Sequence, residues 1–214
     1  MLRRLFLTAL LAGLAAGLAV SAVQWARVLP LIAAAERYEV APAGGAPAAA
    51  AEPAPDSLRH LRTLAANGLA GVGFGLLLAA GLALSPWPVS ARSGLLWGAA
   101  GFAVFALAPA LGLPPVLPGA HEAPLRARQL WWGATVAASA LGLVAFQARP
   151  PLQALGVAAA LLPHLVGPPR PDGPGATALP EALAREFVAA SLSATAAFWL
   201  VLGAVAGYVW SRLR

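Results

Sequence analysis

Near the end of an apolar run the chain reads LLPHLVGPP, which places Pro163 directly before His164. Because proline has no N–H group, Pro163 would leave the Ala159 carbonyl without its helical partner, and Pro109 would do the same to Phe105. An imidazole beside a free carbonyl suits a divalent cation such as Co²⁺, Ni²⁺ or Zn²⁺. His164 is therefore a candidate metal ligand. The alternative is that Pro163 ends the helix and His164 only makes a hydrogen bond there.

Two further groups of candidate metal ligands contain carboxylates. His121 and Glu122 are adjacent in GLPPVLPGAHEAPLRARQLWW, residues 112–132, and both could reach one cation only if the backbone bends. A solvated loop is the alternative for this pair. Glu36 and Glu39, in AAAERYE, are three residues apart and would share one face of a helix. At a pore mouth such carboxylates would concentrate divalent cations, although nearby arginines weaken their field.

The sequence lacks the patterns on which most enzymes and nucleic-acid-binding proteins depend. It has no cysteine, no His-x-x-x-His pair and no Gly-x-Ser-x-Gly elbow, and we predict neither an enzyme nor a bound organic cofactor. The net charge of +6 comes from 14 arginines against eight acids, scattered between apolar runs. Without a basic cluster interleaved with aromatics, no nucleic-acid partner is expected.

The composition is that of an integral membrane protein. Hydrophobic residues make up 60% of the chain and charged residues only 10%, against about 25% charged residues in soluble domains. A helix needs roughly 20 apolar residues to cross a bilayer. We predict an all-α, polytopic bundle of six transmembrane helices that forms a single membrane domain over residues 1–214. The predicted spans are residues 5–23, 64–84, 94–113, 130–146, 152–167 and 187–209, of which 152–167 is short, interrupted by Pro163, and re-entrant in the alternative interpretation.

The placement of charges orients this bundle. With six spans and a cytoplasmic N-terminus, the cytoplasmic side holds six arginines and no acid, and the outer side holds eight arginines and all eight acids. Short, purely basic loops are typical of the cytoplasmic side, so we predict that both termini are cytoplasmic. Residues 40–56, rich in alanine and proline, are predicted to form a disordered exterior linker. The N-terminal run exceeds the about 7–15 apolar residues of a signal peptide, which predicts a retained helix, with cleavage as the alternative.

Pairs of glycines four residues apart occur in four of the predicted spans. In lipid, small residues let two helix backbones approach closely, which favours helix association. We therefore predict that these glycines pack the bundle, and they also permit a homo-oligomer. The pairs are Gly13 with Gly17, Gly71 with Gly75, Gly94 with Gly98, and Gly203 with Gly207.

Several stretches together carry a family resemblance. They are LRRLFLTALLAGLAAGLAVSAVQ, ANGLAGVGFGLLL, GLLWGAAGFAVFALAPALGLPPVLPG, RQLWW, LPHLVGPP and FWLVLGAVAGYVW. With these stretches the chain resembles the CbtA family of cobalt transporter subunits over nearly its whole length, most specifically at 94–119 and 128–132. The resemblance implies a multi-pass protein of the bacterial cytoplasmic (inner) membrane that moves Co²⁺ and is linked to cobalamin supply.

The resemblance also implies a partner and a set of motif positions. The partner is a small, one-helix, CbtB-like membrane subunit with a histidine-rich tail, which would supply ligands that this chain lacks. The sequence thus predicts the membrane subunit of a divalent-metal (cobalt) transporter in the lipid bilayer. The alternatives are a non-transporting membrane scaffold or assembly protein and a protein that handles lipid in a lateral apolar groove. The motif positions are Glu36, Glu39, Pro118, Gly119, Glu122, Arg128, Gln129, Pro163 and His164, with His121 outside the motifs.

Overall fold

A computed structural model describes residues 1–36, 38, 56–172 and 179–213 of the chain. Every regular element in these residues is a helix, which confirms the predicted all-α class. The predicted linker at 40–56 lies outside the described residues, except that residue 56 begins a helix. In chain order the elements are α1 (Leu2–Val23), the π-helix η1 (Gln24–Val28), α2 (Leu29–Glu36), α3 (Asp56–Leu84), α4 (Ala91–Phe102), the π-helix η2 (Ala103–Leu107), α5 (Ala108–Ala110), α6 (Leu125–Ala145), α7 (Pro150–Val166) and α8 (Glu181–Arg212).

Four of the described helical segments are long and apolar enough to cross a membrane. They are Leu2–Glu36, Ser57–Leu84, Ala91–Ala110 and Glu181–Arg212. The helices α6 and α7 form where the fourth and fifth spans are predicted, but they are not among these four, and α7 is an apolar helix of only 17 residues. The described residues therefore show an all-helical protein with four candidate spans, and the count of six remains a prediction.

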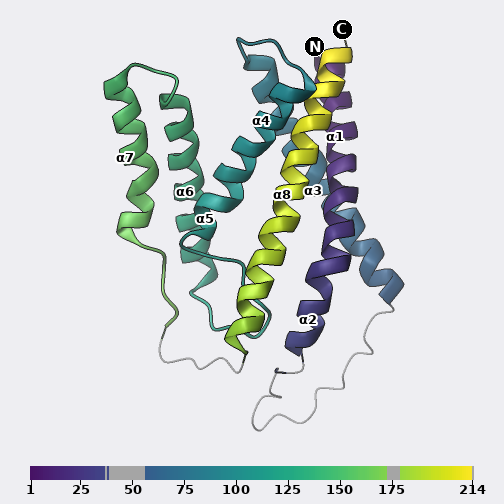
Figure 1. Ribbon diagram of the computed structural model, residues 1–214, viewed down its shortest axis with the longest axis vertical. Coiled ribbons are helices and arrows are strands. Elements are labelled where there is room, and N and C mark those ends of the chain that lie inside the picture. Colours follow the sequence, from purple (N-terminus) through teal and green to yellow (C-terminus); the bar gives the residue numbers. More distant parts are fainter. Residues whose placement is uncertain (37, 39–55, 173–178, 214) are drawn as a thin grey trace.

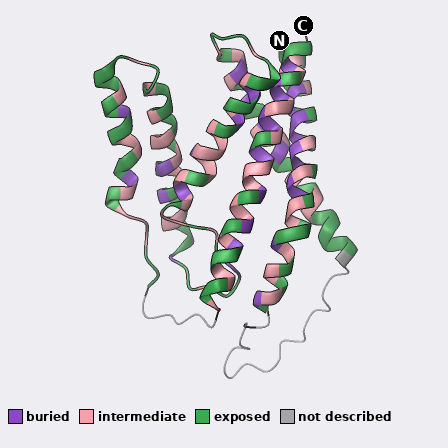
Figure 2. Ribbon diagram, viewed as in Figure 1, coloured by how far each residue is buried: buried purple, intermediate pink, exposed green. Residues whose placement is uncertain are grey.

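The helices form a bundle with a hairpin beside it. The helix α1 packs against α3 and α8, and α8 also packs against α4. The helices α6 and α7 pack against each other, and among the other described helices this hairpin contacts η2 and α5 (Figure 1). Both chain termini lie at one end of the bundle. Buried residues follow the facing sides of α1 and α8, whereas α6 and α7 are largely exposed (Figure 2).

Glycines make the closest helix crossings, as the sequence predicted. Gly17 faces Gly68 across α1 and α3, where an added Cβ would lie 2.9 Å from the Gly68 Cα atom. Gly203 packs on Gly98 across α8 and α4 in the same way, with an added Cβ 2.7 Å from the Gly98 Cα atom. A side chain at these positions would force the backbones apart, so the two crossings depend on glycine.

Two π-helical turns carry prolines that would otherwise interrupt a helix. In each, an N–H group donates to a carbonyl five residues back: Leu29 to Gln24 in η1, and Ala108 to Ala103 in η2. The next residue is a proline, Pro30 or Pro109 in turn. A proline ring clashes with the carbonyl four residues back in a regular α-helix, and the wider turn relieves that clash. For this reason the first helix does not end near residue 23, where the predicted span ended, but continues to Glu36.

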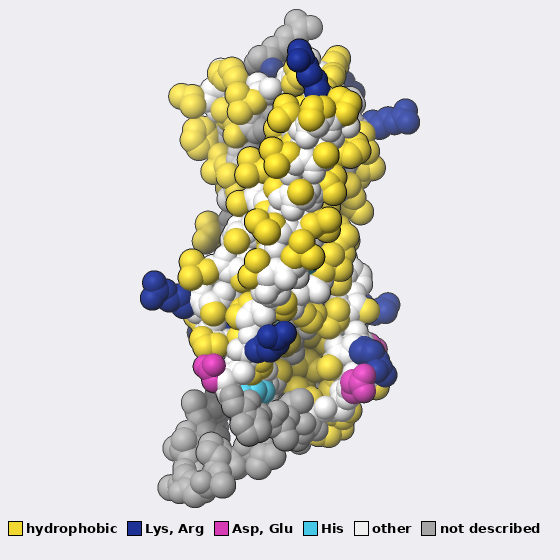
Figure 3. Space-filling view, turned by 90° about the vertical axis from the view of Figure 1, so that its left-hand side faces the viewer, with side chains coloured by type: hydrophobic (Ala, Val, Ile, Leu, Met, Phe, Trp, Pro, Cys, Tyr) yellow, Lys and Arg dark blue, Asp and Glu magenta, His cyan; other side chains and the backbone are white. Residues whose placement is uncertain are grey.

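The described acids lie at one end of the molecule, together with arginines, whereas the end that carries the termini has arginines and no described acid. The end that carries the termini holds Arg4, whose Nε donates to the Trp210 carbonyl at 3.1 Å and whose guanidinium lies 4.2 Å from the Trp210 ring centroid. Every acidic side chain that the structure describes lies near the opposite end. Figure 3 shows an apolar band between the two ends on the face that it presents, with acidic and histidine side chains below it. The described acids thus gather at the end away from the termini, and which side of a membrane each end faces remains a prediction.

Candidate functional site

A cavity of about 520 Å³ lies at the acid-bearing end of the molecule. Its wall combines the segment between α5 and α6, the first turns of α6 and two prolines that follow α7. The lining residues are Gly112, Leu113, Pro114, Pro115, Val116, His121, Glu122, Ala123, Leu125, Arg128, Gln129, Trp132, Pro169 and Pro171. The cavity therefore brings together four of the residues that the sequence singled out: His121, Glu122, Arg128 and Gln129.

A tight turn positions the candidate ligands at the cavity wall. The Ala120 N–H donates to the Leu117 carbonyl at 3.2 Å, which closes a four-residue turn with Pro118 and Gly119 at its centre. Gly119 has φ of 79°, the left-handed value that the third position of a type II turn requires and that glycine adopts without strain. The two motif positions thus have a structural role, because the turn directs the following residues into the cavity wall.

An ion pair engages Glu122, which is the only carboxylate among the described residues of this wall. Nη1 of Arg128 donates to Oε1 of Glu122, and both side chains are about one-third exposed. The Arg128 Nε atom is buried and has no hydrogen-bond partner in the described structure. His121 lies beside this pair in sequence, and its Nε2 is 3.2 Å from the Asp172 carbonyl oxygen. A divalent cation that binds Oε1 of Glu122 would therefore compete with the guanidinium of Arg128.

His164 makes contacts outside this cavity lining. Its Nε2 lies 3.0 Å from the Ala108 carbonyl oxygen and its Nδ1 lies 3.3 Å from that of Ala160. A neutral imidazole has a single N–H group, and we assign it to the shorter contact, which joins α7 to α5. The ring also meets Trp131 edge-on at 5.7 Å, and Trp131 Nε1 donates to the Pro163 carbonyl at 3.1 Å. Helix α7 continues past Pro163 to Val166, so His164 lies in its last turn.

The remaining predicted ligands do not line the cavity. Glu36, at the end of α2, lies 3.9 Å from Arg59 of α3, and both side chains are close to half exposed. Glu39 lies outside the described residues. Within the described part of the chain, no group of three or more histidine, aspartate or glutamate side chains could hold a metal ion. The described structure thus divides the predicted ligands between the cavity, the end of α7 and the end of α2.

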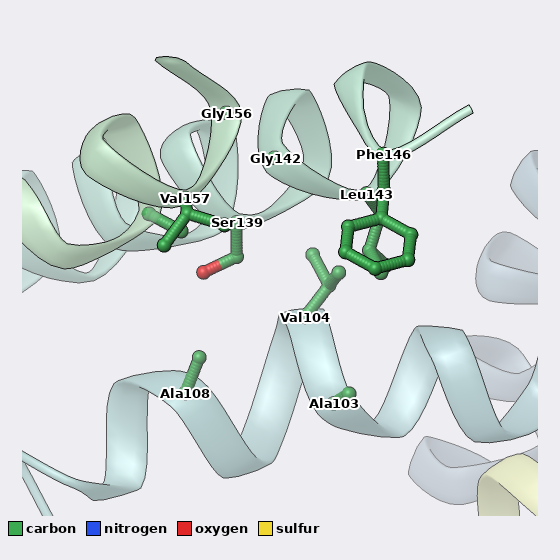
Figure 4. A pocket seen from close by; sticks show the side chains of 10 residues that line it. Ala103, Val104, Ala108, Ser139, Gly142, Leu143, Phe146, Gly156 and Val157 are labelled. Atoms are coloured by element: carbon green, nitrogen blue, oxygen red, sulfur yellow. The ribbon is translucent and has the colours of Figure 1, made fainter. Parts of the chain in front are cut away.

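A second, apolar crevice of about 270 Å³ separates the α6–α7 hairpin from η2 and α5. Figure 4 shows Val104 and Ala108 on one side, with Ser139, Leu143 and Phe146 on the other. Its one polar side chain is that of Ser139, so this crevice offers no ligand set for a cation.

Two contact groups were not predicted from the sequence. Asn67 of α3 donates to Ser21 Oγ at 2.9 Å and to Gln24 Oε1 at 2.7 Å, which joins α3 to α1 and η1 through polar side chains. Trp132 lines the cavity and lies 6.4 Å from the ring of Phe105 in η2. The sequence feature that could have indicated the Asn67 contacts is the presence of three polar residues near the ends of two consecutive predicted spans. The second depends on helix packing, which periodicity does not give.

A family model described as "Probable cobalt transporter subunit (CbtA)" matches residues 2–211, nearly the whole chain. The chain belongs to the CbtA family. CbtA is a family of transporter subunits and not of enzymes, and the long apolar helices of this member suit an integral membrane protein. No curated protein and no solved structure matches the chain.

Proposed function

We propose that this CbtA protein carries Co²⁺ across a bacterial cytoplasmic membrane that it crosses six times, with both termini in the cytoplasm. The choice of cobalt as the transported ion rests on the family match. The orientation is supported by the one-sided distribution of acids, because the termini end carries Arg4, Arg92 and Arg149, while the described acids lie at the other end. Short basic segments favour the cytoplasmic side. In this arrangement α6 and α7 are the two further spans, and the cavity opens outside.

The cavity is the proposed place where the cation enters. Glu122 offers a carboxylate, His121 an imidazole and Gln129 an amide oxygen, all of which suit a divalent first-row metal. A hexahydrated ion fills roughly 180 Å³, at about 30 Å³ for each water, and this fits within the 520 Å³ of the cavity. The cation would therefore arrive with its bound water. It would then replace the Arg128 guanidinium as the partner of the Glu122 carboxylate. A CbtB-like partner subunit would supply the ligands that complete the coordination.

The observation that carries this proposal is the cavity with an acid and a histidine in a CbtA chain, and metal-dependent stabilisation tests it. We expect Co²⁺ to raise the unfolding temperature of the purified protein more than Mg²⁺ does, and Ni²⁺ provides the closest comparison. Glu122→Gln should remove this shift. Glu181→Gln is the matched control, because Glu181 also pairs with an arginine, Arg185, at the same end of the molecule. A scaffold that carries no metal predicts no shift in any of the three proteins.

The six-span orientation is tested by thiol labelling, for which the cysteine-free chain is suited. Ala120→Cys lies in the turn of the cavity wall, and Ala148→Cys lies between α6 and α7. A membrane-impermeant thiol reagent on intact cells should label Ala120→Cys, and it should label Ala148→Cys only after the cells are lysed. Labelling of both variants on intact cells would refute the proposed crossing of α6.

A further inference from the structure

Four aromatic side chains pack together in the middle of the bundle. Phe105 of η2 stacks on Trp199 of α8, with ring centroids 5.3 Å apart and planes 17° from parallel. Phe74 of α3 meets Phe105 edge-on at 5.5 Å, Trp199 at 5.1 Å and Phe198 at 6.0 Å. Phe74, Phe105, Phe198 and Trp199 are here called the aromatic plug. Its rings come from three elements far apart in the sequence.

The plug lies between the cavity and the termini end of the bundle. On the cavity side, Trp132 lines the cavity wall and its ring lies 6.4 Å from that of Phe105. On the other side, α3 and α8 continue toward the termini end with Leu82 and Leu202, which are 2% and 0% exposed. Packed apolar side chains therefore fill the bundle between the cavity and the termini end. Hydrophobic constrictions of this kind exclude water and ions from a pore.

Phe105 is the member of the plug that lies on an irregular helix. It is the central residue of η2, whose five-residue turn precedes Pro109. A π-helical turn contains one more residue than the α-helical turn around it, and such turns are frequent at functional sites. If the extra residue moves past Phe105 along the helix, the side chain rotates about the helix axis by about 100°, the angle for one residue. The ring can thus leave Trp199 while the helix remains intact.

We propose that the aromatic plug is the gate of the cation path and that Phe105, carried by η2, is the side chain that opens it. The structure then represents the state that is open toward the cavity and closed toward the termini. This inference rests on the proposed transport function and adds the residue that controls passage. Pro109 fits this role, because it cannot donate to the Phe105 carbonyl and so disfavours the regular helix that would fix the ring.

Thiol labelling behind the plug tests the gate without using cobalt. Leu202→Cys places one thiol on the termini side of the plug in a chain that has no other cysteine. The protein is held in lipid nanodiscs, where a water-soluble thiol reagent reaches both faces of the membrane. We expect Phe105→Ala to raise the labelling rate at Leu202→Cys by at least about tenfold, since protection reflects the population of the open form. Phe6→Ala is the control, because Phe6 is an aromatic residue that is 60% exposed on α1.

The outcome separates the gate from other roles of the ring. Equal labelling of Leu202→Cys with Phe105 or alanine at position 105 would overturn the proposal, and so would an equal rise in Phe6→Ala. Should Phe105→Ala not fold, Phe105→Leu keeps an apolar side chain but loses the stacking, and we expect its labelling rate to exceed that of the Phe105 protein. Failure of the transport function itself would be seen separately, as cells that accumulate no cobalt while the labelling pattern still depends on Phe105.

Discussion

The ion pair between Glu122 and Arg128 should affect how tightly the cavity binds a cation. The two side chains are about one-third exposed, so water partly screens their attraction and a divalent ion can compete with the guanidinium. The sequence identified both residues, but it did not show that they pair, because the pairing depends on the turn through Gly119. In the proposed function, Arg128 therefore competes with the metal for the Glu122 carboxylate.

Replacing the competitor should strengthen metal binding. We expect Arg128→Gln to bind Co²⁺ about fivefold more tightly, which corresponds to the roughly 1 kcal/mol that a partly exposed ion pair contributes. Titration calorimetry on the purified protein measures the dissociation constant. Arg185→Gln, which breaks the pair with Glu181, is the matched control and should leave binding unchanged. Weaker binding by Arg128→Gln would mean that the arginine holds the site together and does not compete for it.

His164 gives a second prediction at this scale, because its ring joins two helices. Loss of the hydrogen bond to Ala108 and of the edge contact with Trp131 should lower the unfolding free energy of His164→Ala by about 1–3 kcal/mol. Denaturant unfolding in detergent measures this change. His60→Ala is the control, because the His60 ring packs 5.3 Å from that of Trp25 and makes no hydrogen bond to another helix in the described part of the chain. Unchanged stability together with lost cobalt binding would instead identify His164 as a metal ligand, as the sequence predicted.

At the scale of elements, the glycine crossings hold the bundle together. An added Cβ at Gly203 would lie 2.7 Å from the Gly98 Cα atom, so α4 and α8 would have to separate. We expect Gly203→Ala to lower the unfolding free energy by about 1–3 kcal/mol, the usual cost of overpacking. Gly73→Ala is the matched control on α3, where an added Cβ meets nothing within 4 Å. Thermal unfolding of the two variants should differ clearly, and equal stability would contradict the close crossing.

Apolar runs and glycine spacing predicted where most helices lie and which faces meet. The helix at Asp56–Leu84 contains the predicted span 64–84, and Glu181–Arg212 contains 187–209. The π-helical turns could not be predicted in this way, because each depends on how the helix around a proline packs against its neighbours. The sequence consequently did not predict that the first helix continues to Glu36, and it singled out Phe105 for its carbonyl, whereas the structure shows the packing of its ring.

The sequence singled out several residues of the candidate site, but it did not predict how they are arranged in space. Adjacent residues such as His121 and Glu122 are close in any fold, and the turn at Gly119 brings them into one cavity wall. The position of His164 is set by the Ala108 carbonyl, 56 residues earlier in the chain. Such long-range contacts leave no trace in periodicity or local motif spacing.

On the scale of the whole molecule, two features define the proposed path. The acids and the cavity lie at one end, and the arginine-bearing termini lie at the other. Between them the aromatic plug closes the bundle, so the proposed path is open at the cavity and closed toward the termini. A protein of the CbtA family with this layout is expected to admit the cation from the acid-bearing side and to release it at the side that carries the termini.

Uptake of radioactive cobalt by cells tests the central claim that Co²⁺ passes through the cavity by way of Glu122. The protein and its variants are expressed at matched levels in cells that lack their own copy. Cells with the unaltered protein should accumulate cobalt, cells with Glu122→Ala should fall to the level of cells without it, and Glu181→Ala should leave uptake unchanged. Cobalt accumulation by Glu122→Ala at the rate of the unaltered protein would contradict the account.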